Sequence, residues 1–328
     1  MLFIESSVFV DSLLIFVLAF VIDAVFGEFP DRIHPTVWIG KVIAYFKAKF
    51  KNENPRIEKV NGVILCLLAI LVVAVPVYFL LFGIRYFFGW VPYIVASAIL
   101  FKTTFAANCM RRYTIPIAEA LKNGDLDKAK KGLYYIVRRD PANLSEQQIA
   151  SAAVESIAES TTDGITSPFF FFALFGVAGA FAFRVVNTLD SMVGYKDEEH
   201  RNIGWFSASL DSIANYVPAR VTAVLMVVAA ALLGENWRES WRILQRDKTK
   251  TNSLNAGWTM SAMAGALGVQ LEKAGHYALG DKGDISPAHI RRALRIMELT
   301  AVLFGAVVVF PIIALKALAI RLVAWRSL

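Results

Sequence analysis

The chain has 328 residues, of which 56% are hydrophobic and only 19% are charged, and its formal net charge is +7. Soluble domains are roughly half apolar and about a quarter charged, so this composition excludes an ordinary soluble domain and indicates an integral membrane protein. The positive charge does not indicate nucleic-acid binding, because the Lys and Arg residues of a membrane protein gather in cytoplasmic loops and face anionic lipid.

Apolar segments long enough to cross a bilayer recur along the chain. A hydrocarbon core of about 30 Å requires roughly 20 apolar residues in a helix. The segments that qualify are 8–26, 61–83, 89–107, 165–186, 217–233 and 298–320. The fourth and fifth are weaker, because Arg184 and Arg220 stand near their ends. We therefore expect an all-α, polytopic membrane protein with one integral membrane domain and about four to six transmembrane helices, re-entrant segments being the alternative at the two weak positions.

Basic residues are concentrated in three of the intervening loops, namely 28–60, 108–164 and 234–297. Because short cytoplasmic loops carry the excess of Lys and Arg, these three loops are expected in the cytoplasm and both termini outside. The same count places loop 188–216 outside. The expected location is the cell membrane, with a multi-pass topology.

The cytoplasmic loops are expected to contain helices. Ser145 and Gln148 form the pattern of a capping box, so a helix is predicted to begin there. In 236–247, Trp237, Trp241 and Leu244 share a stripe flanked by arginines. That stripe is typical either of a helix in the headgroup region or of a helix packed against a neighbouring protein surface.

Acidic residues recur at a regular spacing in the helix that follows Ser145. Glu155, Glu159 and Asp163 lie four residues apart, and in a continuous α-helix they share a face separate from the apolar one. A solvated surface is the alternative interpretation. Asp190 and Asp211 stand beside apolar segments, where ionisable groups are costly and usually functional.

Familiar nucleotide and metal motifs are absent from the sequence. There is no G-x-x-x-x-G-K-[ST] loop, no G-x-G-x-x-G after a predicted strand, and no H-E-x-x-H. The four histidines are scattered, so a histidine-based metal site has no support.

Three strings of residues resemble one known family. The central string runs from Asn187 to Tyr195 and reads NTLDSMVGY, and Asp163-Gly164 precedes it. The early string is D-x-x-x-G-E-x-P, from Asp23 to Pro30, followed by His34-Pro35, and the late string begins with Asn255-Ala256-Gly257. Together they resemble adenosylcobinamide-phosphate synthase, the CbiB/CobD family of cobalamin biosynthesis, over nearly the whole chain. Departures from the family pattern at Ser160, at 259–262 and at 272–273 put a catalytic role for those positions in doubt.

The resemblance implies an enzyme that joins adenosylcobyric acid to aminopropanol phosphate in an ATP-dependent amide ligation. It implies ATP and Mg²⁺, a corrinoid as substrate, contact with membrane lipid and with the following membrane-bound cobalamin synthase, and an active site that faces the cytoplasm. No nucleic-acid partner is expected.

For this reaction, Glu155, Glu159 and Asp163 are expected to hold Mg²⁺ and to supply the base, with Asp190 and Asp211 as alternative metal ligands. Residues expected to bind the substrates or their phosphates are Arg139, Asn187, Asp190, Lys196, Arg201, Asp211, Arg220 and Asn255, together with Arg184.

Two other functions fit a polytopic membrane protein. One is a membrane sensor or regulator without catalytic activity, similar to AmpE-type proteins, although such a protein would not need the polar string from Asn187 to Asp190. The other is a transporter, but transporters tend to have repeated halves and the sequence shows no internal repeat. A ligase has a difficulty of its own, because loop 188–216 carries the most specific string and yet is expected on the side away from ATP. Re-entrant segments, or a loop folded into a cavity at membrane depth, would resolve this conflict.

Overall fold

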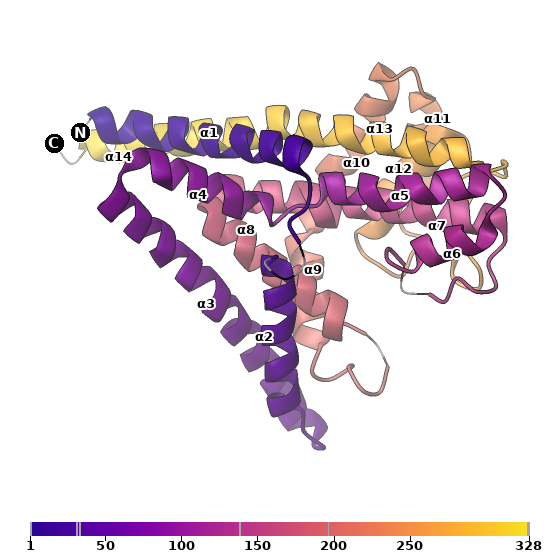
Figure 1. Cartoon of the computed structure of the whole chain (residues 1–328), viewed down its shortest axis with the longest axis horizontal. Coiled ribbons are helices and arrows are strands. Elements are labelled where there is room, and N and C mark those ends of the chain that lie inside the picture. The colour runs from indigo at the N-terminus through magenta and orange to yellow at the C-terminus, as the bar shows by residue number, and fades with distance from the viewer. Residues whose placement is uncertain (1, 31, 33, 138, 196, 327–328) are drawn as a thin grey trace. The chain divides into compact units, whose positions relative to one another are not determined.

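The computed structural model describes residues 2–30, 32, 34–137, 139–195 and 197–326 (Figure 1). The described residues form two compact units, each built from segments that are distant in sequence. Unit 1 comprises Met1–Phe105, Ser167–Ala214 and Ala306–Leu328, and unit 2 comprises Ala106–Thr166 and Asn215–Gly305.

Unit 1 consists of helices that pack mainly through phenylalanine. Its helices are α1 (Leu2–Phe26), α2 (Pro35–Phe50), α3 (Pro55–Phe88), α4 (Trp90–Lys102), α8 (Ser167–Val193), α9 (Trp205–Ala214) and α14 (Phe310–Arg326). Helix α1 lies against α4 and α14, and α8 contacts α2, α3 and α4 (Figure 1). Between α1, α4 and α8, Phe16 contacts Phe169 edge-on at 5.0 Å and Phe101 stacks on Phe172 at 4.1 Å. Aromatic pairs of this geometry stabilise a core beyond the area that they bury.

Unit 2 consists of shorter helices and one β-hairpin. Its elements are α5 (Ala107–Lys122), α6 (Leu126–Leu133), α7 (Glu146–Ser160), the π-helical segment η1 (Thr161–Thr166), α10 (Tyr216–Leu232), α11 (Trp237–Asp247), α12 (Ala256–Leu267), β1 (Leu271–Lys273), β2 (Tyr277–Leu279) and α13 (Pro287–Phe304). A second π-helical segment, η2 (Gly305–Val309), begins at the last residue of unit 2 and leads into α14 of unit 1. Helices α11 and α12 approach closely because Gly265 has no side chain. A Cβ atom there would lie 2.4 Å from the backbone oxygen of Glu239.

The expected membrane segments correspond to helices of the structure. Among the described residues, five helices are long and apolar enough to cross a membrane: Val8–Phe26, Pro55–Phe88, Trp90–Lys122, Glu146–Val193 and Pro287–Val323. A sixth candidate is the bent pair α9 and α10, which has the form of a broken span or a re-entrant loop. The prediction of an all-α polytopic protein with four to six spans is therefore confirmed. The sidedness of its loops stays a prediction.

The two predicted loop helices are both present. Helix α7 begins after Ser145 with the complete capping box that the sequence predicts, since Ser145 and Gln148 cap each other. Helix α11 packs on α12, and its Leu244 is buried while Trp237 and Trp241 remain 45% exposed. Leu244 therefore packs within the chain, whereas contact of this helix with a neighbouring protein stays a prediction. Contact of the two tryptophans with headgroups stays a prediction. The hairpin of β1 and β2, with Leu271 opposite Leu279, was not among the expected elements.

Candidate functional site

A buried carboxylate on α7 lies at the centre of the polar contacts of unit 2. The residues from Ile149 to Val154 are buried, and Glu155, which follows them, is only 6% exposed. Ser151 Oγ donates to Glu155 Oε1 at 2.9 Å, and Arg139 Nη2 lies 3.3 Å from the same oxygen. Burial of a carboxylate is costly unless the carboxylate is paired and hydrogen-bonded, and these two contacts offset part of that cost.

The third donor to Glu155 comes from the hairpin. Tyr277 on β2 donates its hydroxyl hydrogen to Glu155 Oε2 at 2.7 Å. Burial, the negative charge and hydrogen bond of Glu155, and the charge of Glu159 raise the pKa of Tyr277 far above its ordinary value. Tyr277 therefore remains a protonated donor at physiological pH. On β1, Glu272 N donates to Ser151 Oγ at 3.0 Å, which fastens the hairpin to α7 at a second point.

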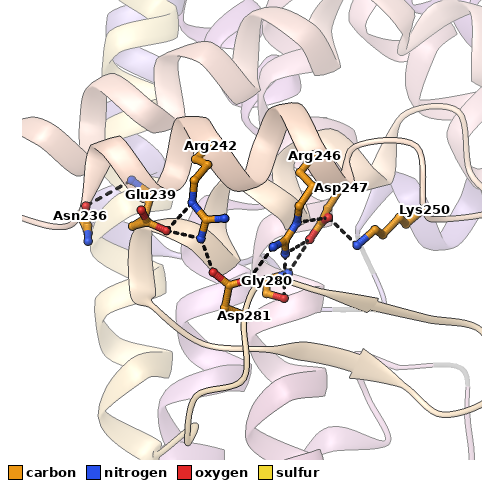
Figure 2. A network of polar contacts seen from close by, with 8 residues as sticks. All are labelled: Asn236, Glu239, Arg242, Arg246, Asp247, Lys250, Gly280 and Asp281. Atoms are coloured by element: carbon orange, nitrogen blue, oxygen red, sulfur yellow. Dashed lines mark hydrogen bonds and ion pairs between the residues drawn. The ribbon is translucent and has the colours of Figure 1, made fainter.

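A network of ions holds the other end of the hairpin against α11 (Figure 2). Asp247, whose side chain is fully buried, accepts from Arg246 Nε at 2.7 Å and from Gly280 N at 2.8 Å, and Lys250 lies 2.6 Å from it. Asp281, which follows β2, pairs with both Arg242 and Arg246. Strand β2 is thus held at its start by the bond from Tyr277 to Glu155 and just after its end by the bond from Gly280 to Asp247. The ion network around Asp247 therefore helps to position Tyr277, although none of its side chains contacts Glu155.

This network makes a prediction about acid stability. Burial opposes the charge of Asp247, but the donors Arg246, Lys250 and Gly280 N outweigh it and lower the pKa of Asp247 from 3.8 to about 2. A lowered folded-state pKa stabilises the fold above pH 3.8, and the contribution is lost as the pH falls toward 2. Asp247→Asn is expected to lower the free energy of unfolding at pH 7 by at most about 2 kcal/mol, and to weaken the dependence of stability on acid pH. Unfolding in detergent as a function of pH measures both effects.

Asp281→Asn serves as the matched control, because its side chain is 54% exposed and solvent screens its ion pairs. We expect it to lower the free energy of unfolding much less than Asp247→Asn does. Equal effects of the two substitutions would contradict the assignment of the stabilising contact to Asp247.

A second cluster of predicted residues in unit 2 surrounds Arg220 on α10. Arg220 Nη1 donates to Asn255 Oδ1 at 2.8 Å, and its guanidinium lies over the rings of Tyr216 and Trp258, at 3.4 and 4.7 Å from their centroids. Lys248 Nζ also lies 4.7 Å from the Trp258 centroid. Two cations at one indole ring form a region suited to an anion, which agrees with the phosphate-binding role predicted for Arg220.

In unit 1 the predicted residues Asn187 and Asp211 meet. Asn187 Nδ2 donates to Asp211 Oδ1 at 3.3 Å, and Asn187 Oδ1 accepts from Arg184 Nη1 at 3.1 Å. Arg184 Nε donates to the backbone oxygen of Thr104 at 2.8 Å. The polar string at the end of α8 is therefore an ordered network, in which Asn187 links Arg184 to Asp211.

The remaining predicted residues are more dispersed. Glu159 is exposed one helical turn after Glu155, Asp163 lies in η1, Asp190 is half-buried near the end of α8, and Arg201 is exposed. The wider π-helical turn of η1 breaks the four-residue spacing on which the face of three acidic residues depends. Lys196 lies outside the described residues.

The described residues test whether protein side chains alone could hold the predicted Mg²⁺ ion. Among them, no group of three His, Cys, Asp or Glu side chains lies close enough together to hold a metal ion. A closed protein cage therefore does not fit. Magnesium that is held by one or two carboxylates together with substrate phosphates does not need such a cage. The metal-binding role of Glu155, Glu159 and Asp163 stays a prediction.

An apolar cavity of about 280 Å³ in unit 1 contains none of the predicted residues. Its lining includes Pro35 and Trp38 of α2, Val73 of α3 and Phe181 of α8, and the other lining residues are also apolar. A lining of this kind does not fit a nucleotide, so the polar clusters remain the better candidates for chemistry.

Comparison with known proteins identifies the family. The family profile described as CobD/Cbib protein matches residues 16–297. The chain belongs to the CobD/CbiB family. It is 43% identical over 303 residues to a probable cobalamin biosynthesis protein CobD of Methanothermobacter thermautotrophicus, covering 90% of this chain and 98% of that protein. It is 44% identical over 275 residues to a cobalamin biosynthesis protein CobD of Dehalococcoides mccartyi, covering 84% of this chain and 88% of that protein. No solved structure matches the chain.

Membership of the CobD/CbiB family confirms the resemblance that the three sequence strings indicate, and it assigns the chain a role in cobalamin biosynthesis. The alternative of a sensor without catalytic activity is not favoured. Sequence reasoning did not assign roles to Tyr277, Ser151 or Lys248. Tyr277 carries no motif, and only the fold brings it to a residue 122 positions earlier in the chain.

Proposed function

We propose that this CobD/CbiB protein catalyses the ATP-dependent ligation of adenosylcobyric acid to aminopropanol phosphate, which yields adenosylcobinamide phosphate. The family match over 16–297 carries the proposal, because it narrows the function to cobalamin biosynthesis. The buried carboxylate of Glu155, with an arginine and a tyrosine in contact with it, supports an enzyme rather than a passive membrane protein.

The reaction requires the propionate carboxylate of the corrinoid to be activated before an amine can attack it. In the proposed sequence the terminal phosphoryl group of ATP passes to this carboxylate and ADP leaves. The amine nitrogen then forms the C–N bond, phosphate leaves, and a base accepts the proton. Mg²⁺, when bound, neutralises charge on the ATP phosphates.

The protein's own residues have distinct roles in this proposal. Glu155 accepts the amine proton, and Tyr277 and Arg139 hold its carboxylate in place. Arg220, held between two aromatic rings and bonded to Asn255, binds a phosphate group. The network around Asn187 and Asp211 presents amide and carboxylate groups to polar substituents of a substrate.

The direct test is reconstitution of the purified protein in detergent or nanodiscs with adenosylcobyric acid, aminopropanol phosphate, ATP and Mg²⁺. We expect formation of adenosylcobinamide phosphate, detected by mass spectrometry, with one ADP released per amide bond. Omission of the amine, ATP or Mg²⁺ should each abolish the product. Product formation without ATP consumption would contradict the proposal.

We further propose that the active site faces the cytoplasm, where ATP is available, and that lipid and the following membrane-bound cobalamin synthase are neighbours of this protein. The orientation is testable with cysteines introduced one at a time in a Cys109→Ser background, in which the remaining native cysteine, Cys66, is buried. Glu198→Cys lies in an exposed part of loop 188–216, and Phe88→Cys lies 72% exposed beside the break between α3 and α4. In intact cells, an impermeant maleimide is expected to label Phe88→Cys and to label Glu198→Cys only after permeabilisation. Labelling of Glu198→Cys in intact cells would place this loop outside and contradict an ATP site there.

A further inference from the structure

The apolar cavity of unit 1 has no part in the proposed reaction. It has a volume of about 280 Å³, and its lining comes from α2, α3, α4 and α8 and is apolar throughout. Two of the lining residues, Trp38 on α2 and Val72 on α3, are 59% and 46% exposed, so the cavity opens to the exterior of the protein. A ligand can therefore enter it without unfolding of the surrounding helices.

Three of the helices that line the cavity belong to segments that could cross a membrane. Val73 lies in Pro55–Phe88, Leu100 in Trp90–Lys122 and Phe181 in Glu146–Val193. The medium around such segments is lipid hydrocarbon, so apolar chains rather than water fill an apolar opening between them. One turn of an α-helix about 10 Å wide occupies roughly 400 Å³, so a further helix does not fit and a slender chain does.

Helix α2 has the form of a helix that lies along the membrane surface. It contacts α3 and α8, and Figure 1 shows it running across the direction of α1, which precedes it in the chain. Its residues Trp38, Lys41, Tyr45 and Lys49 recur every three or four positions and are all exposed, so they share one face. Tryptophan, tyrosine and lysine on one face are typical of an element at the level of the lipid headgroups.

The exposed face of α2 is positively charged. Lys41 Nζ lies 5.9 Å from the centroid of the Trp38 ring, and Lys49 Nζ lies 4.6 Å from that of Tyr45. Neither lysine forms an ion pair among the described residues, and the sequence of α2 contains no acid. Because Trp38 lines the cavity and is exposed, the Lys41 ammonium lies beside the opening, where a cation attracts the phosphate of a lipid.

We propose that this cavity binds one acyl chain of an anionic phospholipid, whose phosphate pairs with Lys41. The apolar lining accounts for the chain, and the ammonium beside the opening accounts for a preference for a negatively charged headgroup. Trp38 separates the two environments, because its ring lines the cavity while its Nε1 donates to the backbone oxygen of Arg32 at 3.1 Å. The site is independent of the proposed ligation, since it contains none of the residues assigned to that reaction.

Photocrosslinking locates the acyl chain. The full-length protein in detergent receives a limiting amount of phosphatidylglycerol with a diazirine in its acyl chain, and mass spectrometry identifies the labelled peptides after irradiation. We expect labels on the segments of α2 and α3 that line the cavity, and an excess of unlabelled phosphatidylglycerol should remove them. Val73→Trp fills the cavity and should also remove them.

Val75→Trp is the matched control, because Val75 lies on the same helix and is 41% exposed but does not line the cavity. It should leave the labels unchanged. If circular dichroism shows that Val73→Trp does not fold, Val77→Phe fills the cavity with a smaller ring and should reduce the labels in the same way. Labels that persist in a folded cavity-filling variant overturn the proposal.

Native mass spectrometry measures the preference for the headgroup. Wild-type protein should bind phosphatidylglycerol about 5-fold more tightly than phosphatidylcholine with the same acyl chains. Lys41→Gln should abolish most of this preference, whereas Lys49→Gln, about 12 Å further along the helix, should retain it. Equal binding of the two lipids by the wild-type protein overturns the proposal, as does a preference that Lys41→Gln leaves unchanged.

The same spectra test a second copy of this chain as the occupant of the cavity. In that case a dimer forms without added lipid, Val73→Trp dissociates it, and the lining segments are not labelled, which overturns the lipid site. A monomer that carries the label on the lining segments of α2 and α3 supports it.

Discussion

Glu155→Gln is expected to lower the rate of amide formation by about 100-fold or more, because it removes the proposed base and leaves Arg139 beside an uncharged amide. The amide has nearly the same shape as the carboxylate and its oxygen still accepts from either Tyr277 or Ser151, so the helical fold should persist. Turnover of the reconstituted protein measures the rate, and circular dichroism checks the fold.

Glu146→Gln is the matched control for this substitution, since Glu146 lies exposed in the first turn of the same helix. It should retain near-normal turnover.

Tyr277→Phe removes one donor to Glu155 and should lower the rate of amide formation by roughly 10-fold. Near-normal turnover in separate alanine variants of Glu155, Glu159 and Asp163 would rule out a catalytic role for the acidic residues of this region.

Lys102→Met is expected to destabilise the protein by about 3–5 kcal/mol, the largest effect on stability that the structure predicts. The methionine is unbranched and only one heavy atom shorter than the lysine, but it leaves the carboxylates of Asp23 and Glu28 buried without their shared cation. The free energy of unfolding in detergent, measured by chemical denaturation, should show the loss.

A rescue experiment identifies the cause of that loss. Combining Lys102→Met with Asp23→Asn and Glu28→Gln removes both carboxylate charges that faced Lys102, and it should restore part of the stability because the cost arises from charge rather than from shape. Lys47→Met removes a partly exposed ion pair with Glu199 and should destabilise the protein much less than Lys102→Met does. A triple variant no more stable than Lys102→Met would show that packing causes the loss.

Several features of the fold could be predicted because they depend on neighbouring residues. Five of the six apolar segments coincide with helices long and apolar enough to cross a membrane, and 217–233 falls in the bent pair α9 and α10. The capping box at Ser145 and Gln148 begins α7 as expected. The prediction that Glu155, Glu159 and Asp163 share one helix face depends on uninterrupted α-helical spacing. The segment η1 begins after Glu159 and changes that spacing at Asp163, which no local pattern in 161–166 indicated.

The pairing of the candidate residues could be predicted only in part. Arg139, Glu155, Asn187, Asp211, Arg220 and Asn255 were all expected to bind substrates or to act in catalysis, and they form three contacting pairs. Which of them would meet was not predictable. Asn187 and Asp211 belong to different helices, and Arg220 lies on α10 whereas Asn255 precedes α12. The partner hydroxyl of Glu155 was missed altogether, since Tyr277 lies on a short hairpin in a loop that was expected to be helical.

The opening features of the sequence, its excess of apolar residues and deficit of charge, were enough to determine that this is a polytopic helical membrane protein. They determine it because the length and periodicity of an apolar segment are properties of contiguous residues. Only the tertiary structure decided that Tyr277 donates to Glu155 and that Lys102 faces Asp23 and Glu28. Those contacts join residues more than 70 positions apart, and they arise from the way separate helices and a hairpin pack together, which no single stretch of sequence encodes.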